Sequence, residues 1–163
     1  MEFDVDADVP RERQQLSLPE SKLAELREWA VEGTALTAAA RVRDADDRIA
    51  LVKNRWSDGW ILPGGGVEPG ERPVAAVRRE VREETGLEAT VGDPILVVEQ
   101  TYRSQRDGTH RFSARYVVFA ARADGDIPDP ERLGVGPDEI AAARWFASIP
   151  DELHDGDLLR PYL

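Results

Sequence analysis

The chain has no cysteine, one methionine and only two lysines, Lys22 and Lys53, among its 163 residues. Without cysteine it can form neither a disulfide nor a thiolate-ligated metal site. It also lacks any apolar run close to the roughly 20 residues that a membrane-spanning helix needs. Its acidic N-terminus has no apolar signal-peptide core. We therefore expect a soluble, cytoplasmic protein with no membrane partner.

Positive charge is scarce, since 32 acidic residues against 21 basic ones give a formal net charge of −11. Such a surface repels nucleic-acid backbones and anionic membranes, so we expect no nucleic-acid partner. It does not exclude a nucleotide substrate, because a bound cation can invert the local field. An acidic, lysine-poor composition is typical of proteins from salt-loving (halophilic) organisms, and high-GC coding bias is the alternative explanation.

One acidic stretch, residues 65–87, organises the chain. Pro73 suits the first turn of a helix and Gly86 suits the position just past its end, so we expect a helix between them. Acids at i, i+3 and i+4 of that helix share one face: Glu80, Glu83 and Glu84. Three like charges so close repel one another. A divalent cation such as Mg²⁺ would relieve this repulsion, because it prefers carboxylate oxygens.

A run of three glycines, at 64–66, comes just before this stretch of acids. Glycine lets the backbone pass close to a ligand and point its amides or carbonyls inward. A glycine loop that leads into an acidic helix suits a metal–phosphate site, in which carboxylates hold the cation and the cation holds the phosphate.

These residues resemble the Nudix box, whose pattern is G-x5-E-x7-R-E-U-x-E-E-x-G-U, with U aliphatic. The matching positions are Gly65, Glu71, Arg79, Glu80, Val81, Glu83, Glu84, Gly86 and Leu87. Seven fixed letters match by chance on the order of once in 10⁸ positions. The alternative, a solvated acidic helix, does not account for spacing that matches at both ends.

The resemblance implies a metal-dependent hydrolase that cleaves a pyrophosphate bond in a nucleoside diphosphate linked to another group. Nucleoside triphosphates, including damaged nucleotides, are slightly favoured as substrates over ADP-ribose and other NDP-sugars. The alternative function is a non-catalytic Nudix-fold nucleotide sensor. Such sensors usually lose glutamates of the box, whereas this sequence keeps all of them.

The resemblance also implies a role for individual residues. The ligands of Mg²⁺ or Mn²⁺ would be Glu80, Glu83 and Glu84, and the Gly64 carbonyl is a further candidate. Structural support of the site would come from Glu71, Arg79, Gly65 and Gly86. The general base varies in this family, and both Glu83 and Glu139 are candidates.

The resembled fold is α/β (α+β), an α/β/α sandwich around a mixed sheet. The strands expected from the sequence cover residues 34–43, 49–54, 60–62, 89–91, 94–103, 111–122 and 139–147, and a short helix follows Ser148 or Asp151. We expect the Nudix domain to occupy residues 34–163. Residues 1–33 lie outside the resemblance, as an N-terminal arm and helix.

In the N-terminal part, residues 1–16 lack periodicity and predict a mobile arm. Residues 18–31 have roughly helical spacing, with Ser17 and Glu20 as a capping box. This helix packs on the domain or serves a homodimer, and packing is favoured.

The long strands 94–103 and 111–122 predict a hairpin that gathers candidate substrate-binding side chains. They are Tyr102, Arg103, Arg111 and Arg115, and they could cradle a base and a phosphate. Trp56, in a polar loop, is one more candidate. Surface charge and edge aromatics are the plainer interpretation of the hairpin residues.

Overall fold

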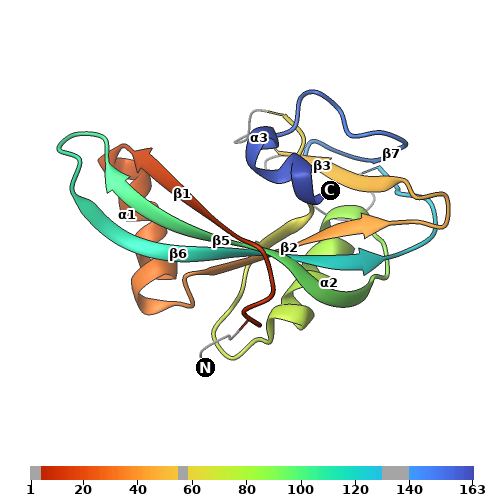
Figure 1. The fold of residues 1–163 in the computed structure, drawn as a ribbon, viewed down its shortest axis with the longest axis horizontal. Coiled ribbons are helices and arrows are strands. Elements are labelled where there is room, and N and C mark those ends of the chain that lie inside the picture. The colour runs from red at the N-terminus through yellow and green to blue at the C-terminus, as the bar shows by residue number, and fades with distance from the viewer. Residues whose placement is uncertain (1–4, 55–58, 130–139) are drawn as a thin grey trace.

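The computed structural model describes residues 5–54, 59–129 and 140–163. In chain order the elements are β1 (Arg11–Leu18), α1 (Glu20–Arg27), the π-helical turn η1 (Glu28–Glu32), β2 (Leu36–Arg43), β3 (Ile49–Lys53), β4 (Gly64–Gly66), α2 (Pro73–Thr85), β5 (Thr90–Ser104), β6 (His110–Arg122), β7 (Ala142–Phe146), α3 (Gly156–Leu159) and the 3-10 turn η3 (Arg160–Tyr162) (Figure 1). No helix in this described part is long and apolar enough to cross a membrane.

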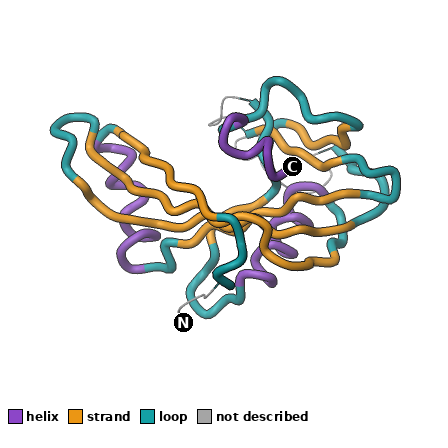
Figure 2. The backbone as a smooth tube through the Cα atoms, in the orientation of Figure 1, coloured by secondary structure: helices purple, strands orange, loops and turns teal. Residues whose placement is uncertain are grey.

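A seven-stranded mixed sheet forms the centre of the molecule (Figure 2). Its order is β1-β5-β6-β2-β3-β7, and β4 pairs with β2 beside this path. The β1–β5 and β2–β6 pairs are parallel, whereas β5–β6 and β3–β7 are antiparallel. The mixed sheet expected from the sequence is therefore confirmed.

Alternate residues of β2 reach two different cores on the two faces of the sheet. Ala38 and Ala40 pack in one buried cluster with Val77 and Val81 of α2. Ala39 packs in a second cluster, which contains residues of the C-terminal segment that includes α3. Helices α2 and α3 thus cover opposite faces, which confirms the α/β/α arrangement.

The β5–β6 hairpin extends past α2 to one side of the molecule, where α1 lies against it (Figure 1). There, Leu23 of α1 packs with Tyr102 and Phe112 in a third buried cluster. We expected separate strands at 89–91 and 94–103, but the structure has the single strand β5, with register shifts near Pro94. The chain at 60–62 makes only isolated bridges within the described residues.

The N-terminal prediction was wrong in two respects. Residues Arg11–Leu18 are not an arm but an edge strand, which pairs with β5 from Arg11↔Val97 to Leu18↔Ser104. The helix begins at Glu20 and not at residue 18, so Ser17 lies in the strand and makes no cap, and Pro19 is the N-cap. The strand displaces the capping box because residues 11–18 pair with β5, and this pairing satisfies one row of their backbone groups.

Helix α2 agrees with the prediction at both ends. It begins at Pro73 and ends at Thr85, and Gly86 follows with φ 77°, in the left-handed region that glycine adopts at least cost. The last predicted strand is shorter than expected, because β7 begins at Ala142.

The turn between β2 and β3 depends on one buried carboxylate, that of Asp44. Its Oδ1 accepts hydrogen bonds from the backbone N–H groups of Asp46 (3.1 Å) and Arg48 (2.8 Å), and its Oδ2 accepts one from Arg48 Nε (2.7 Å). Burial alone would raise the pKa of Asp44, but the hydrogen bonds from Arg48 and Asp46 outweigh it and lower this pKa.

We expect Asp44→Ala to lower the Tm by several degrees at neutral pH, because three donors lose their acceptor. Since the folded pKa is lowered, the contribution of the carboxylate is complete above its unfolded pKa of about 3.9 and is lost as the pH falls through the folded value. Thermal melts at pH 7 and near pH 2 measure this, with exposed Asp46→Ala as the control. An equal Tm loss for both variants at pH 7 would contradict the assignment.

Candidate active site

The glycine strand β4 lies flat against β2, and this contact fixes where the acidic helix sits. Gly64, Gly65 and Gly66 pair with Ala39, Ala38 and Thr37 respectively. A Cβ added at Gly64 would lie 2.5 Å from the Ala38 carbonyl oxygen, against backbone that cannot easily move. A Cβ at Gly65 would lie 2.5 Å from Glu80 Oε1. Backbone contact therefore requires glycine at position 64, whereas a side chain at position 65 would displace the Glu80 carboxylate.

Glu84 of α2 joins the helix directly to this strand. Its Oε1 accepts a 2.7 Å hydrogen bond from the backbone N–H of Gly64, and the residue is only 9% exposed. A buried carboxylate therefore lies next to the glycine backbone, as a metal–phosphate site would require.

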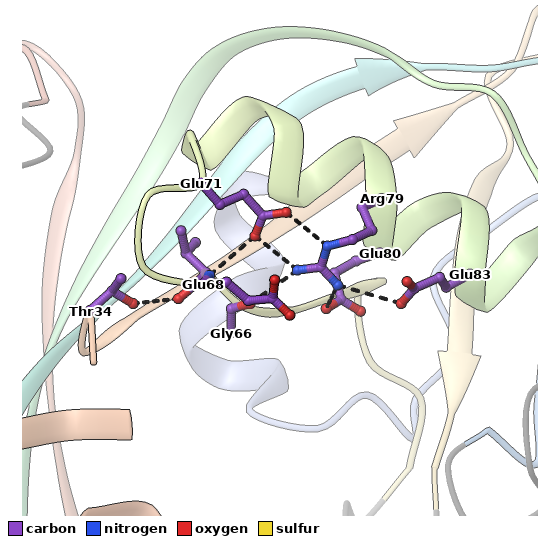
Figure 3. Close-up of polar contacts among 8 residues, drawn as sticks. Thr34, Gly66, Glu68, Glu71, Arg79, Glu80 and Glu83 are labelled. Atoms are coloured by element: carbon purple, nitrogen blue, oxygen red, sulfur yellow. Dashed lines mark hydrogen bonds and ion pairs between the residues drawn. The ribbon is translucent and has the colours of Figure 1, made fainter. Parts of the chain in front are cut away.

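Arg79 lies at the centre of a polar network that connects α2 to the loop before it (Figure 3). Its Nε and Nη2 donate to the two carboxylate oxygens of Glu71, at 2.8 and 2.9 Å. Its Nη1 donates to Glu80 Oε1 at 2.8 Å and contacts Glu83 Oε2 at 3.5 Å. Nη2 also reaches the Gly66 carbonyl at 3.3 Å. The guanidinium thus joins loop, strand and helix.

These contacts shift the pKa values in opposite directions. The hydrogen bonds from Arg79 lower the pKa of Glu71 and outweigh its burial. Burial raises the pKa of Glu80, and Arg79 offsets this only in part. The hydrogen bond to Glu71 is the main cause of the raised pKa of Arg79. The charged carboxylate of Glu71 is therefore stabilised by its hydrogen bonds, whereas Arg79 only partly offsets the cost of burying the charge of Glu80.

The donor set of α2 fits a divalent cation in its chemistry. Glu80 and Glu84 are largely buried carboxylates, and the Glu83 side chain is 56% exposed beside them. Within residues 5–54, 59–129 and 140–163, however, no three acidic or histidine side chains are arranged as a formed metal site. Arg79 holds Glu80 and contacts Glu83, while Gly64 holds Glu84. A cation at this site would therefore share these carboxylates with Arg79 and Gly64 or displace those partners.

A cavity of about 320 Å³ opens beside the same glycine strand. Gly64 lines it, so the backbone that bonds Glu84 also forms part of its wall. Most of the lining comes from strands β1, β2, β5 and β6 and from the C-terminal segment. These residues are Gln14, Thr37, Ala39, Gln100, Tyr102, Tyr116, His154, Asp155, Leu158 and Leu159. Asn54, Ile61 and Leu62 complete the described lining. Strand β4 therefore contacts both the acidic helix α2 and the cavity.

The structure does not bring the four hairpin candidates together. Tyr102 is buried, lines the cavity and pairs with Phe112 across the hairpin. Arg115 pairs with Glu99, and the strand alternation puts both on the opposite face from Tyr102.

The other two arginines of the hairpin contact neighbours away from the cavity. Arg111 donates to Glu20 Oε1 at 2.7 Å. Arg103 donates to the Gly108 carbonyl at 3.0 Å. Two further candidates, Trp56 and Glu139, lie outside the residues that the structure describes.

Several cavity residues escaped the sequence analysis. One of them is His154, whose half-exposed side chain lines the cavity and lies 3.4 Å from Asp155 Oδ2. Gln14 was assigned to a mobile arm. The feature that could have revealed this strand is the alternation along β1, where every second residue is partly buried. Its inward residues begin with Glu12 and Gln14, and these polar positions concealed the strand pattern.

The fold and this site define a class of protein, an α/β/α domain with an acidic helix on a glycine strand. The chain matches the family model of the NUDIX domain over residues 33–156 and belongs to that family. It is 42% identical over 92 residues to human diphosphoinositol polyphosphate phosphohydrolase 3-alpha, which covers 56% of this chain and 53% of that protein. Over 64 residues it is 42% identical to rat diphosphoinositol polyphosphate phosphohydrolase 2, covering 39% and 36% respectively. The chain spans about half or less of these curated relatives.

Solved structures agree on the family. A UDP-X diphosphatase structure is 26% identical, with a TM-score of 0.52, and the match covers 83% of this chain and 64% of that one. A MutT NUDIX hydrolase from Burkholderia pseudomallei is 25% identical, also with a TM-score of 0.52, and covers 78% of this chain and 96% of that one.

We expect Gly65→Ala to weaken Mn²⁺ binding by roughly 10-fold or more, because the new Cβ displaces the Glu80 carboxylate. The fold should survive, since a flexible side chain can move. Isothermal titration with Mn²⁺ beside a thermal melt measures both effects. Gly66→Ala is the matched control, because its Cβ would meet Trp29 Nε1 at a tolerable 3.4 Å. Wild-type Mn²⁺ affinity in Gly65→Ala would refute this account.

We expect Arg79→Lys to lower the free energy of unfolding by roughly 1–2 kcal/mol, a value that allows for solvent screening of these partly exposed pairs. Lysine cannot form the two parallel hydrogen bonds to Glu71 and also reach Glu80. Urea denaturation measures the change. Arg78→Lys, on the exposed side of α2, is the control and should stay within about 0.5 kcal/mol of wild type. Equal stability of the two variants would contradict the role of Arg79.

Proposed function

We propose that this NUDIX protein hydrolyses a pyrophosphate bond in a nucleoside diphosphate linked to another group. The observation that carries the proposal is the position of Gly64. Its N–H holds the buried carboxylate of Glu84, and the same residue lines the cavity. A substrate in the cavity would therefore place its phosphates next to the acidic face of α2.

Glu80, Glu83 and Glu84 would hold Mg²⁺ or Mn²⁺, with the Gly64 carbonyl as a further candidate ligand. When bound, the cation neutralises phosphate charge and makes the diphosphate a better electrophile. Arg79 and Glu71 keep the loop and helix in register, so the carboxylates remain at the glycine strand.

Hydrolysis needs a water whose oxygen forms a new bond to one phosphorus while the bridging P–O bond breaks. A general base accepts the proton of that water, and the departing phosphate oxygen carries away the bonding electron pair. Glu83 is the candidate base among the described residues, because its half-exposed carboxylate can reach water. Glu139 is the second candidate.

Nucleoside triphosphates are slightly favoured as substrates, with ADP-ribose or another NDP-sugar next. The names of the similar proteins are diverse, since they include diphosphoinositol polyphosphate phosphohydrolases and a UDP-X diphosphatase. A pyrophosphate linkage is the chemistry common to these names. Of the substrate-binding candidates, Tyr102 has the best support, because it lines the cavity.

Glu83→Gln and Glu84→Gln should each reduce kcat by at least roughly 100-fold, the low end for loss of a catalytic group. Both should remain folded, because the substitution keeps the shape of the side chain. Released phosphate or pyrophosphate is measured with Mg²⁺ over a panel of nucleoside triphosphates, ADP-ribose and NDP-sugars. The panel is run at low and at molar salt, given the net charge of −11.

The control is Glu88→Gln, an exposed acid just past α2 that pairs with Arg82 at 3.3 Å. It should keep wild-type turnover. A folded Glu84→Gln protein with full activity would defeat the assignment. If the wild type binds nucleotides but hydrolyses none of the panel, the non-catalytic sensor becomes the better description.

A further inference from the structure

Two glutamine side chains from neighbouring strands meet at the wall of the cavity. Gln14 of β1 and Gln100 of β5 are directly paired in the sheet register. Gln100 Nε2 donates a 3.0 Å hydrogen bond to Gln14 Oε1, and both side chains line the cavity. A carboxamide has two donor hydrogens and an acceptor oxygen with two lone pairs. This single hydrogen bond uses neither the amide hydrogens of Gln14 nor the carbonyl oxygen of Gln100, so the pair can offer a donor and an acceptor to a ligand.

The rest of the cavity is unsuited to a polyanion. None of its described lining residues is lysine or arginine, the side chains that bind clustered phosphates. One of them, Asp155, is acidic. A ring that carries many phosphates would meet Asp155 here and no basic side chain among the described lining residues.

A flat, uncharged heterocycle fits the same lining. Tyr102 and Tyr116 supply aromatic surface, and Ala39 and Leu159 add apolar contact. Nucleobases carry neighbouring donors and acceptors on one edge, and glutamine side chains read such edges through paired hydrogen bonds. The amide pair offers a donor beside an acceptor.

We infer that Gln14 and Gln100 recognise the edge of a nucleobase in this cavity, so that the substrate is a nucleoside diphosphate derivative and not a polyphosphorylated inositol. The inference rests on the proposed function and adds the residues that recognise the base of its substrate. It assigns a specificity role to β1, which lies before residue 33, where the match to the NUDIX domain begins. The diphosphate would lie at the Gly64 end of the cavity, beside Glu84.

The test uses Gln14→Leu and Gln100→Leu in the full chain. Gln15→Leu is the matched control, because Gln15 is the next residue on β1, is exposed and faces away from the cavity. Steady-state hydrolysis of ATP, GTP, CTP and UTP is measured with Mg²⁺. Losing one paired contact should raise KM for the preferred nucleotide roughly 10- to 100-fold with little change in kcat. Gln15→Leu should match the wild type.

Hydrolysis of inorganic tripolyphosphate, which has no base, should be the same in all four proteins. A KM unchanged in both Gln14→Leu and Gln100→Leu overturns the inference while the proposed hydrolase stands.

If the wild type hydrolyses no nucleotide, saturation-transfer NMR with the four nucleoside 5′-monophosphates and inositol hexakisphosphate tests the base site alone. Binding of a monophosphate to wild type and Gln15→Leu, but not to Gln14→Leu, supports it. Binding of inositol hexakisphosphate and of no monophosphate overturns it.

Discussion

The close approach of helix α2 to the glycine strand β4 is the constraint on which the site depends. A side chain at Gly64 would strike the backbone of β2, and one at Gly65 would strike the Glu80 carboxylate. Without side chains in the way, the Gly64 N–H reaches Glu84 and the Gly66 carbonyl receives Arg79. The helix can then bring two largely buried acids, Glu80 and Glu84, against the backbone of one short strand, which ordinary packing would not favour because buried charge is costly.

That crowding gives the site two chemically distinct ends. At one end, carboxylates of α2 concentrate negative charge that a divalent cation would offset, and Arg79 partly balances it in the present state. At the other end, amide and aromatic side chains line the cavity. A nucleotide has the same division, with charge confined to its phosphates and an uncharged ring beyond them. A cation held by the α2 carboxylates would make the strongly acidic surface compatible with such a substrate, because the phosphates would meet that cation.

The sequence predicted the parts of the structure that depend on local signals. Pro73, Gly86 and the spacing of Glu80, Glu83 and Glu84 define α2 without tertiary information, and the long strands of the hairpin followed from composition. Strand β1 was missed because its parallel pairing with β5 is distant in sequence and its inward face is polar at Glu12 and Gln14. The grouping of Tyr102 with Arg115 failed because a face depends on register, which composition does not specify.

The most direct test is a crystal structure of the protein with Mn²⁺ and an α,β-methylene nucleoside triphosphate, whose bridging carbon resists cleavage. The account predicts an anomalous manganese peak in contact with the carboxylates of Glu80, Glu83 and Glu84 and with a phosphate oxygen. It also predicts the base against the Gln14–Gln100 pair. The contradicting result would be a fully occupied nucleotide with no manganese at these carboxylates, while the carboxylates keep their contacts with Arg79 and Gly64. That result would refute the central claim that α2 holds a cation against a diphosphate.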